Sequence, residues 1–220
     1  MMTVFFFVVL SQGDLHRRIL LLVLAGSWSA RLTWYLFHDR VLRKWRIEDG
    51  RYARMRQAMG KWNQLGFFIF FQIQAVFIVL FSLPMIPVAT NSRPLGYIDL
   101  FGIMVGIIAI IGEWISDRQL AAFRKRPINA NRTCREGLWR YSRHPNYFFE
   151  CLHWLLYIPL AVGHPLWYLS IFGPIFMYGF IMFVTGVPHT ERQAASHRPD
   201  YIEYQQTTSA LIPWFPRRKS

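Results

Sequence analysis

The chain is 220 residues long, with 53% of its residues hydrophobic and only 17% charged. Its 25 Lys and Arg outnumber its 12 Asp and Glu, which gives a formal net charge of +13. That charge would suit a nucleic-acid-binding protein, but a soluble protein of that kind would not be so apolar. The combination argues against nucleic acid as a partner and indicates a membrane protein whose basic residues lie at its aqueous ends.

Apolar stretches of roughly the length that crosses a bilayer, about 20 residues, recur along the chain. We predict five transmembrane helices, at residues 19–37, 65–88, 98–115, 147–162 and 166–187. Residues 1–10 are apolar but too short to span, so we expect an interfacial segment or the remnant of a helix. The predicted fold is therefore an all-α multi-pass transmembrane bundle, in which residues 1–220 form a single integral membrane domain.

The basic residues gather in three segments between or after the predicted helices. Residues 38–62 contain eight Lys or Arg, residues 116–146 contain eight, and the tail from residue 189 contains five. Five membrane crossings place all three segments on one side, and an excess of Lys and Arg is typical of cytoplasmic loops. We therefore expect the basic loops and the C-terminus in the cytoplasm.

Ionisable side chains at hydrocarbon depth are costly, so those inside predicted spans are expected to be paired or to line a cavity. Glu113 and Asp117 are four residues apart and share one face at the end of the third span. Arg124 would continue that face if the helix extends beyond the span. The alternative is an ordinary ion pair at the end of a helix, where long side chains reach the aqueous phase.

A second group of polar residues follows one stripe of the fourth span, at spacings of four, three and four: Asn146, Glu150, His153 and Tyr157. Each member must find a hydrogen-bond partner inside the bundle, so we expect the stripe to line a cavity. The alternative is a polar contact between helices that fixes only their packing.

A cluster of hydrogen-bond donors stands just before that helix, with Arg140, Arg143 and His144 close to the free N–H groups of the helix start. Such an arrangement binds anions well, although anchoring of the topology would also explain the two arginines. Cys134 and Cys151 form no disulfide framework and are expected to be inert. The seven histidines contain no pair at a helical metal-ligand spacing, so we expect no metal ion.

The block from Gly137 to Glu150, which contains Arg-Tyr-Ser-Arg-His-Pro-Asn-Tyr, resembles the membrane-embedded steroid 5α-reductase-like family in its bacterial DUF1295-type branch. The resemblance extends to Thr185-Gly-Val-Pro188, Glu191 and a tail of the form Tyr-x-x-Tyr with Ile-Pro-Trp, and it runs from about residue 19 to residue 214. It implies an enzyme that uses NADPH to reduce a carbon-carbon double bond conjugated to a carbonyl in a lipophilic, 3-oxo-Δ4-steroid-like substrate. The family's first two helices are expected to be missing.

The resemblance also implies roles for individual residues. Segments 116–146 and 189–220 are expected to bind the cofactor from the cytoplasmic side. Glu113 stands where the family has asparagine, and Ala121 where it has arginine. The expected cofactor contacts are Asp117, Arg124, Arg135, Arg140, Arg143, His144, Asn146, Tyr147, Glu150, Glu191 and Tyr204.

For the chemical step, the resemblance implies Tyr35 and Glu150 as catalytic residues, since Tyr35 falls close to the position of a catalytic tyrosine in the family. The expected substrate contacts are Gln72, Gln74, Glu113, His153 and Tyr157. The expected partners are a lipophilic small molecule and the bilayer, without an obligate protein partner.

Two alternative functions stay open at this point. Membrane methyltransferases of the isoprenylcysteine carboxyl methyltransferase type share the Arg-His-Pro-x-Tyr block and the Ile-Pro tail but use S-adenosylmethionine. Asn146 together with Glu150 favours the reductase. A truncated, inactive relative is the third interpretation, because a fold does not fix a function.

Overall fold

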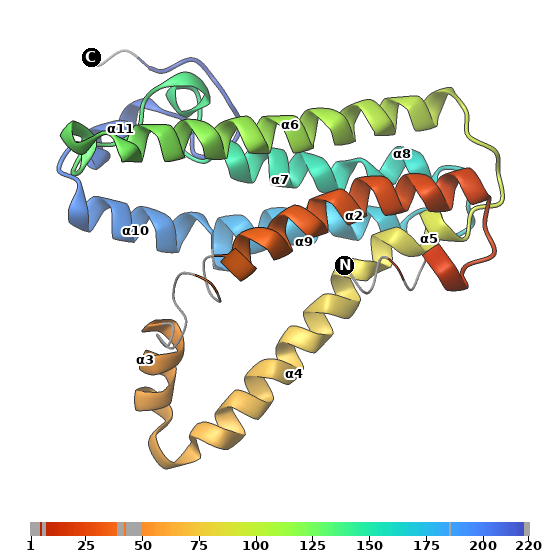
Figure 1. Cartoon of the computed structure of the whole chain (residues 1–220), viewed down its shortest axis with the longest axis horizontal. Coiled ribbons are helices and arrows are strands. Elements are labelled where there is room, and N and C mark those ends of the chain that lie inside the picture. Colours follow the sequence, from red (N-terminus) through yellow and green to blue (C-terminus); the bar gives the residue numbers. More distant parts are fainter. Residues whose placement is uncertain (1–4, 6–7, 39–41, 43–49, 185, 218–220) are drawn as a thin grey trace. The chain divides into compact units, whose positions relative to one another are not determined.

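The computed structural model describes residues 5, 8–38, 42, 50–184 and 186–217, and every regular element in this part of the chain is helical (Figure 1). The predicted all-α class is therefore confirmed. Contacts divide the chain into two compact units, Met1–Pro94 and Leu95–Ser220, which we describe separately. That residues 1–220 form one membrane domain stays a prediction.

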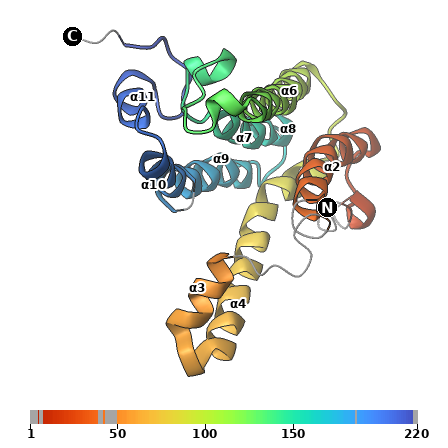
Figure 2. The same ribbon diagram turned by 60° about the vertical axis from the view of Figure 1, so that its left-hand side comes forward.

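The first unit contains one long helix, α2, and a second helical segment that is built in pieces. Tyr52 of α3 packs edge-on against Phe67 and Phe70 of α4, which joins these two helices into a hairpin (Figure 2). Arg17 of α2 is fully buried, and its Nε donates to the carbonyl of Arg93 at 2.5 Å. The elements are α2 (Leu15–Phe37), α3 (Gly50–Met59), η2 (Gly60–Trp62), α4 (Asn63–Ser82), η3 (Leu83–Met85) and α5 (Ile86–Ala89).

The second unit is a helical bundle in which α7 lies between α6 and α9 (Figures 1 and 2). Small residues let α6 approach its neighbours closely, as in membrane helix pairs. A Cβ on Gly102 would lie 3.0 Å from Pro159, and one on Gly112 would collide with the ring of Phe149. The elements are α6 (Tyr97–Lys125), η4 (Pro127–Asn129), η5 (Gly137–Arg140), α7 (Pro145–Leu155), α8 (Tyr157–Ala161), α9 (Leu169–Gly179), η6 (Phe180–Val184), α10 (Val187–His197) and α11 (Tyr201–Thr207).

Local chemistry sets the ends of these helices. The carboxylate of Asp99 accepts the backbone N–H of Gly96 at 2.7 Å and caps the start of α6. Proline at position 127 disfavours helical geometry at Arg126, where α6 stops. The predicted fourth span is interrupted between α7 and α8, because the ring of Pro159 conflicts with a carbonyl four residues earlier.

Within the described residues, three helical segments are long and apolar enough to cross a membrane: Tyr52–Ala89, Tyr97–Lys125 and Leu169–His197. They contain the predicted second and third spans and residues 169–187 of the predicted fifth span. The helix α2, which contains the predicted first span, is not among these segments, and the fourth predicted span is interrupted between α7 and α8. The membrane-like helices support a bilayer environment, while the number of five crossings stays a prediction.

Candidate functional site

The polar centre of the second unit is built on the turn that leads from η5 into α7. Gly137 has a φ of 58°, and a Cβ at this position would collide with the side chain of Gln119, so the turn requires glycine. Next to it, the N–H of Leu138 donates to Gln119 Oε1 at 2.9 Å, and Trp139 Nε1 donates to the carbonyl of Ser116 at 2.9 Å. These two bonds fasten the turn to α6 and fix the direction in which α7 begins.

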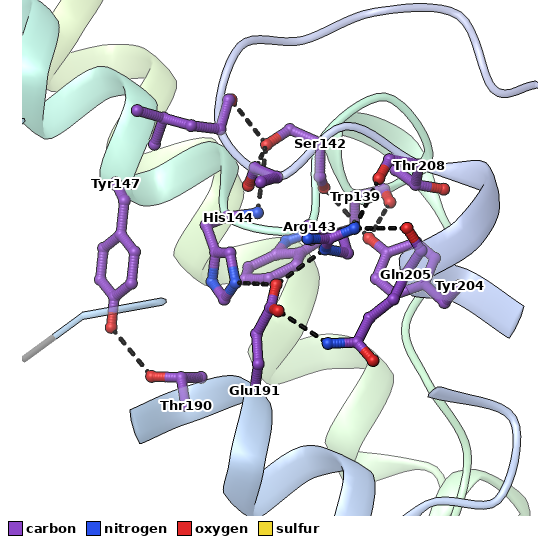
Figure 3. Close-up of polar contacts among 12 residues, drawn as sticks. Trp139, Ser142, Arg143, His144, Tyr147, Thr190, Glu191, Tyr204, Gln205 and Thr208 are labelled. Carbon is purple, nitrogen blue, oxygen red and sulfur yellow. Dashed lines mark hydrogen bonds and ion pairs between the residues drawn. The ribbon is translucent and has the colours of Figure 1, made fainter. Parts of the chain in front are cut away.

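Two residues of the turn meet a carboxylate from α10 (Figure 3). Arg143 Nε donates to Glu191 Oε1 at 2.7 Å, and His144 Nε2 lies 3.0 Å from the same oxygen. The other oxygen of Glu191 accepts from Gln205 Nε2 at 2.7 Å. The side chains of Arg143 and Glu191 are each only 12% exposed. A buried charge pair is stable only when its remaining polar atoms also form hydrogen bonds. For Glu191, His144 and Gln205 provide these additional bonds.

Arg143 also holds the C-terminal tail. Its Nη1 donates to the carbonyls of Gln205 at 2.6 Å and Thr208 at 2.9 Å, and its backbone N–H donates to the carbonyl of Ser209 at 2.8 Å (Figure 3). The neighbouring Ser142 Oγ donates to the carbonyl of Leu211 at 2.7 Å. The turn before α7, the helix α10 and the tail are thus joined through one guanidinium group.

Tyr204 of α11 closes the other side of this network. Its buried hydroxyl lies 3.0 Å from the carbonyl of Ser142 and also contacts the carbonyl of Trp139 (Figure 3). Burial raises the pKa of the Tyr204 phenol, so the hydroxyl keeps its proton and acts as a donor. The guanidinium of Arg135 lies over the ring, 5.5 Å from its centre. The hydroxyl therefore anchors the turn rather than pointing to open space.

A second anchor joins the segment after α6 to the start of α11. The carboxylate of Asp200 accepts the backbone N–H of Thr133 at 2.9 Å and the Thr133 hydroxyl at 2.7 Å. Burial alone would raise the pKa of Asp200, but the hydrogen bonds from Thr133 and the charge of Arg135 lower it overall. Arg135 itself donates to the carbonyl of Asp200 at 2.9 Å and pairs with Glu203 at 3.4 Å.

Asp117 and Asn146 face each other where α6 passes the start of α7. Asn146 Nδ2 donates to Asp117 Oδ1 at 3.4 Å. The Oδ1 atom of Asn146 is buried and has no hydrogen-bond partner among the residues that the structure describes. On the next turn of α7, Glu150 Oε1 accepts from Trp154 Nε1 at 3.3 Å. The contact between Asp117 and Asn146 therefore joins the two polar groups that the sequence assigned to separate spans.

The inner half of the predicted stripe is enclosed. His153 Nε2 lies 3.2 Å from the hydroxyl of Tyr157, and the two side chains are 1% and 0% exposed. Glu113 on α6 is also buried. On α7, Tyr147 stacks on the ring of His144, with ring centres 5.2 Å apart. The stripe thus runs from a partly accessible end at Asn146 to a buried end at Tyr157.

The predicted arginines do not form a single group. Arg140 is exposed. Arg124, with Arg132 and Arg198, lines a small cavity of about 50 Å³ beside the buried thiol of Cys134, whose pKa is raised by burial. A larger cavity, about 370 Å³, lies between the turn and the tail. It is lined by Arg143, Gln205, Gln206, Thr207, Thr208, Ser209, Ala210, Trp214, Phe215 and Arg217.

The sequence pattern does not predict several residues of this site. Gln119, Thr133, Asp200 and Gln205 are ordinary polar residues outside any charged motif, and only their bonds reveal them. Thr208 and Ser209 lie between the Tyr-x-x-Tyr and Ile-Pro-Trp parts of the tail motif, but nothing in the sequence indicates that their carbonyls bind Arg143.

Three predicted residues belong to the first unit. Tyr35 lies in the last turn of α2, and its side chain is outside the described residues. Gln72 and Gln74 are exposed on α4. Their catalytic and substrate roles stay predictions. Within the described ranges, no group of three or more His, Cys, Asp or Glu is placed to hold a metal ion.

The fold and the site together define a class: an all-helical protein with membrane-like helices and a bonded polar network at one end of its bundle. The chain belongs to the DUF1295 family, described as proteins of unknown function, whose model matches residues 1–208. It is 26% identical to an uncharacterized protein of Schizosaccharomyces pombe, over 95% of this chain and 67% of that protein. No solved structure matches the chain.

Proposed function

We propose that this protein is an integral membrane oxidoreductase that uses NADPH to reduce a carbon-carbon double bond conjugated to a carbonyl in a lipophilic substrate. The observation that carries the proposal is the buried amide oxygen of Asn146, which lacks a hydrogen-bond partner among the described residues although Asp117 binds the same amide group. A buried acceptor without a partner is costly. Rotating the amide would only exchange the orphaned oxygen for an orphaned nitrogen.

A nicotinamide ring carries a primary carboxamide, which offers the N–H donors that the Asn146 oxygen lacks. Asp117, next to Asn146, adds a second acceptor at the same place. This pair suits a ligand amide at the partly accessible end of the polar stripe, close to apolar helices that a lipophilic substrate can reach. The fit supports a nicotinamide cofactor over a ligand without a donor group.

The phosphates of such a cofactor need positive charge and hydroxyl donors at the same end of the bundle. Arg124, Arg132 and Arg198 line the small cavity, and Arg217 lies beside three hydroxyl side chains in the larger one. Guanidinium groups bind phosphate through paired, charge-assisted hydrogen bonds. Arg143 is bonded to Glu191 and to the tail, so we assign it a positioning role in shaping the larger cavity.

When bound, a reduced nicotinamide supplies the hydride, and the protein contributes position and electrostatics. Asn146 would orient the ring through its carboxamide. Glu150, held by Trp154 on the following turn, would present its carboxyl group on the same stripe. Tyr35 stays the proposed donor of a proton to the oxygen of the developing enolate, whose charge a hydrogen bond stabilises.

The test is thermal unfolding of the detergent-purified protein with NADPH, NADH or S-adenosylmethionine. We expect NADPH to raise the melting temperature of the wild type, since a ligand that binds only the folded state stabilises it. Asn146→Ala and Glu150→Ala should lose this shift while the melting temperature without ligand changes little. Glu136→Ala is the matched control, because the Glu136 side chain is 57% exposed and pairs with Arg126 at the surface.

Two results would contradict the proposal. Stabilisation by S-adenosylmethionine alone would identify a methyltransferase-like site instead of a reductase. If both Asn146→Ala and Glu150→Ala bound NADPH with the affinity of the wild type, the polar stripe would not be part of the cofactor site, although the protein would still bind NADPH.

A further inference from the structure

A groove of about 430 Å³ runs along α6 to the turn at Gly137 and Leu138. Its wall is a stripe of isoleucines on α6, and Phe149 of α7 packs into the space that Gly112 leaves without a side chain. At one end the groove reaches Gln119 and the turn at Leu138. The isoleucines that line it are Ile107, Ile108, Ile111 and Ile115.

The length and position of the groove match one leaflet of a bilayer. The helix α6 is long and apolar enough to cross a membrane, and its C-terminal end carries the basic residues Arg118, Arg124 and Lys125. From Ile107 to Gln119 the helix rises about 18 Å, at about 1.5 Å per residue. Half of a hydrocarbon core of roughly 30 Å is about 15 Å. The groove therefore covers the leaflet at the basic end of α6.

The basic end of the groove is polar. Gln119 Oε1 accepts from Leu138, which fixes the amide, and in the described part of the chain no acceptor is bonded to its Nε2 donors. Arg118 precedes Gln119, and its guanidinium lies over the ring of Trp114, 4.5 Å from the centre. By helical spacing, Arg118 and Trp114 border the isoleucine stripe. An apolar channel that ends at an amide donor and a cation is complementary to a chain with an anionic head.

We propose that this groove binds one acyl chain of an anionic glycerophospholipid from the leaflet at the basic end of α6. The chain would lie along the isoleucines, the ester and phosphate oxygens would accept hydrogen bonds from Gln119 Nε2, and the phosphate charge would face Arg118. The site needs no reduction chemistry and does not depend on the function proposed above.

The full-length protein, exchanged into a mild detergent, would be titrated with phosphatidylglycerol and with phosphatidylcholine and observed by native mass spectrometry. We expect one retained phosphatidylglycerol. Ile111→Trp, which fills the groove, should weaken this binding by about tenfold, equal to about 1.4 kcal/mol. Met104→Trp is the matched control, because Met104 and Ile111 lie on the same helix and are 48% and 50% exposed, but Met104 is outside the groove.

The charge is tested separately. Arg118→Gln should remove most of the preference for phosphatidylglycerol over phosphatidylcholine, whereas Lys125→Gln, at the end of the same helix, should retain it. Thermal unfolding checks that each variant is folded, and Ile108→Trp replaces Ile111→Trp if the latter does not fold. Equal retention of lipid by the groove variants and by Met104→Trp would overturn the proposal. Displacement of the phospholipid by an equimolar steroid enone would also overturn it and would make the groove a substrate site.

Discussion

Arg143 and Tyr204 lie in the motif block and the tail that resemble a cofactor-binding family, yet their polar atoms are bonded mainly to the chain itself. Arg143 pairs with Glu191 and holds two carbonyls of the tail, and the hydroxyl of Tyr204 binds the turn before α7. A motif in one sequence identifies residue types but not their partners, which here lie 48 to 65 residues away. Direct contact of these two residues with a cofactor stays a prediction, and their role in shaping the site rests on the bonds described.

At the same scale, the Thr133 and Asp200 anchor predicts a pH-dependent stability. The folded-state pKa of Asp200 is lowered overall, so its ionised form is favoured in the folded protein. This contribution is present above the unfolded-state pKa, about 4, and is lost as the pH falls through the lower folded-state pKa. Thr133→Val removes one of the two hydrogen bonds. We expect a lower melting temperature than wild type at pH 7 and a difference that narrows as the pH falls below about 4.

The measurement is the melting temperature of both proteins between pH 7 and pH 3. Thr190→Val serves as the control, because the Thr190 hydroxyl contacts the phenol of Tyr147 at 3.3 Å and is bonded to no carboxylate among the described residues. The difference in melting temperature between Thr190→Val and wild type should not vary between pH 7 and pH 3. Parallel curves for Thr133→Val and wild type would show that Asp200 gains no ionisation-dependent stability from Thr133.

At the scale of elements, hydropathy located the apolar parts of helices but not their ends. The third span was predicted at residues 98–115, and α6 extends to Lys125 because its polar last turns stay helical beyond the apolar region until Pro127 stops them. The fourth span was predicted as continuous, although α7 and α8 are separate. A run of apolar residues indicates that a segment is buried in lipid or protein. The point at which a helix is interrupted depends instead on where a proline ring conflicts with the preceding turn. The pairing of Asp117 with Asn146 needed the packing of α6 on α7, which no local pattern contains.

The close approach of α6 to α8 gives a prediction about packing. A Cβ on Gly102 would lie 3.0 Å from Pro159 and 3.1 Å from the carbonyl of Leu156, so Gly102→Val forces the helices apart. We expect a loss of about 1–3 kcal/mol of unfolding free energy, typical of overpacking. Gly179→Val on α9 is the matched control, since a Cβ there meets no atom within 4 Å. It should change stability by less than about 0.5 kcal/mol, as an ordinary surface substitution does.

Both variants would be compared by unfolding in increasing concentrations of denaturing detergent. A Gly102→Val protein as stable as Gly179→Val would mean that α8 moves away without cost, and that the small-residue face of α6 does not determine the packing of this bundle.

At the scale of the whole molecule, the charge distribution predicts the orientation in the membrane. Of the 25 basic residues, 21 lie in the three segments expected in the cytoplasm. In a variant without Cys134 and Cys151, single cysteines at Lys61, Arg132 or Arg192 should resist a membrane-impermeant maleimide applied to intact cells. Single cysteines at Ser92 or Pro165, in the two short turns, should react. Labelling is read by the mass shift of the purified protein.

Permeabilised cells provide the control, because all five positions are exposed and should then react. Reaction of Arg132→Cys in intact cells would place the central basic segment outside. That outcome would contradict the cytoplasmic assignment of the cofactor segments as well as the topology.

The bonds of Arg143 have a consequence for the order in which the protein is made. The turn before α7 is synthesised well before Glu191, Gln205 and Thr208, which its guanidinium binds. During translation the two bonds to Gln119 and Ser116 of α6 can already hold this turn, whereas the guanidinium of Arg143 meets its partners only after they are synthesised. The bonds of Arg143 are complete only once Gln205 and Thr208 have been added, so a turn already fastened to α6 gains its remaining bonds from residues synthesised about 60 positions later.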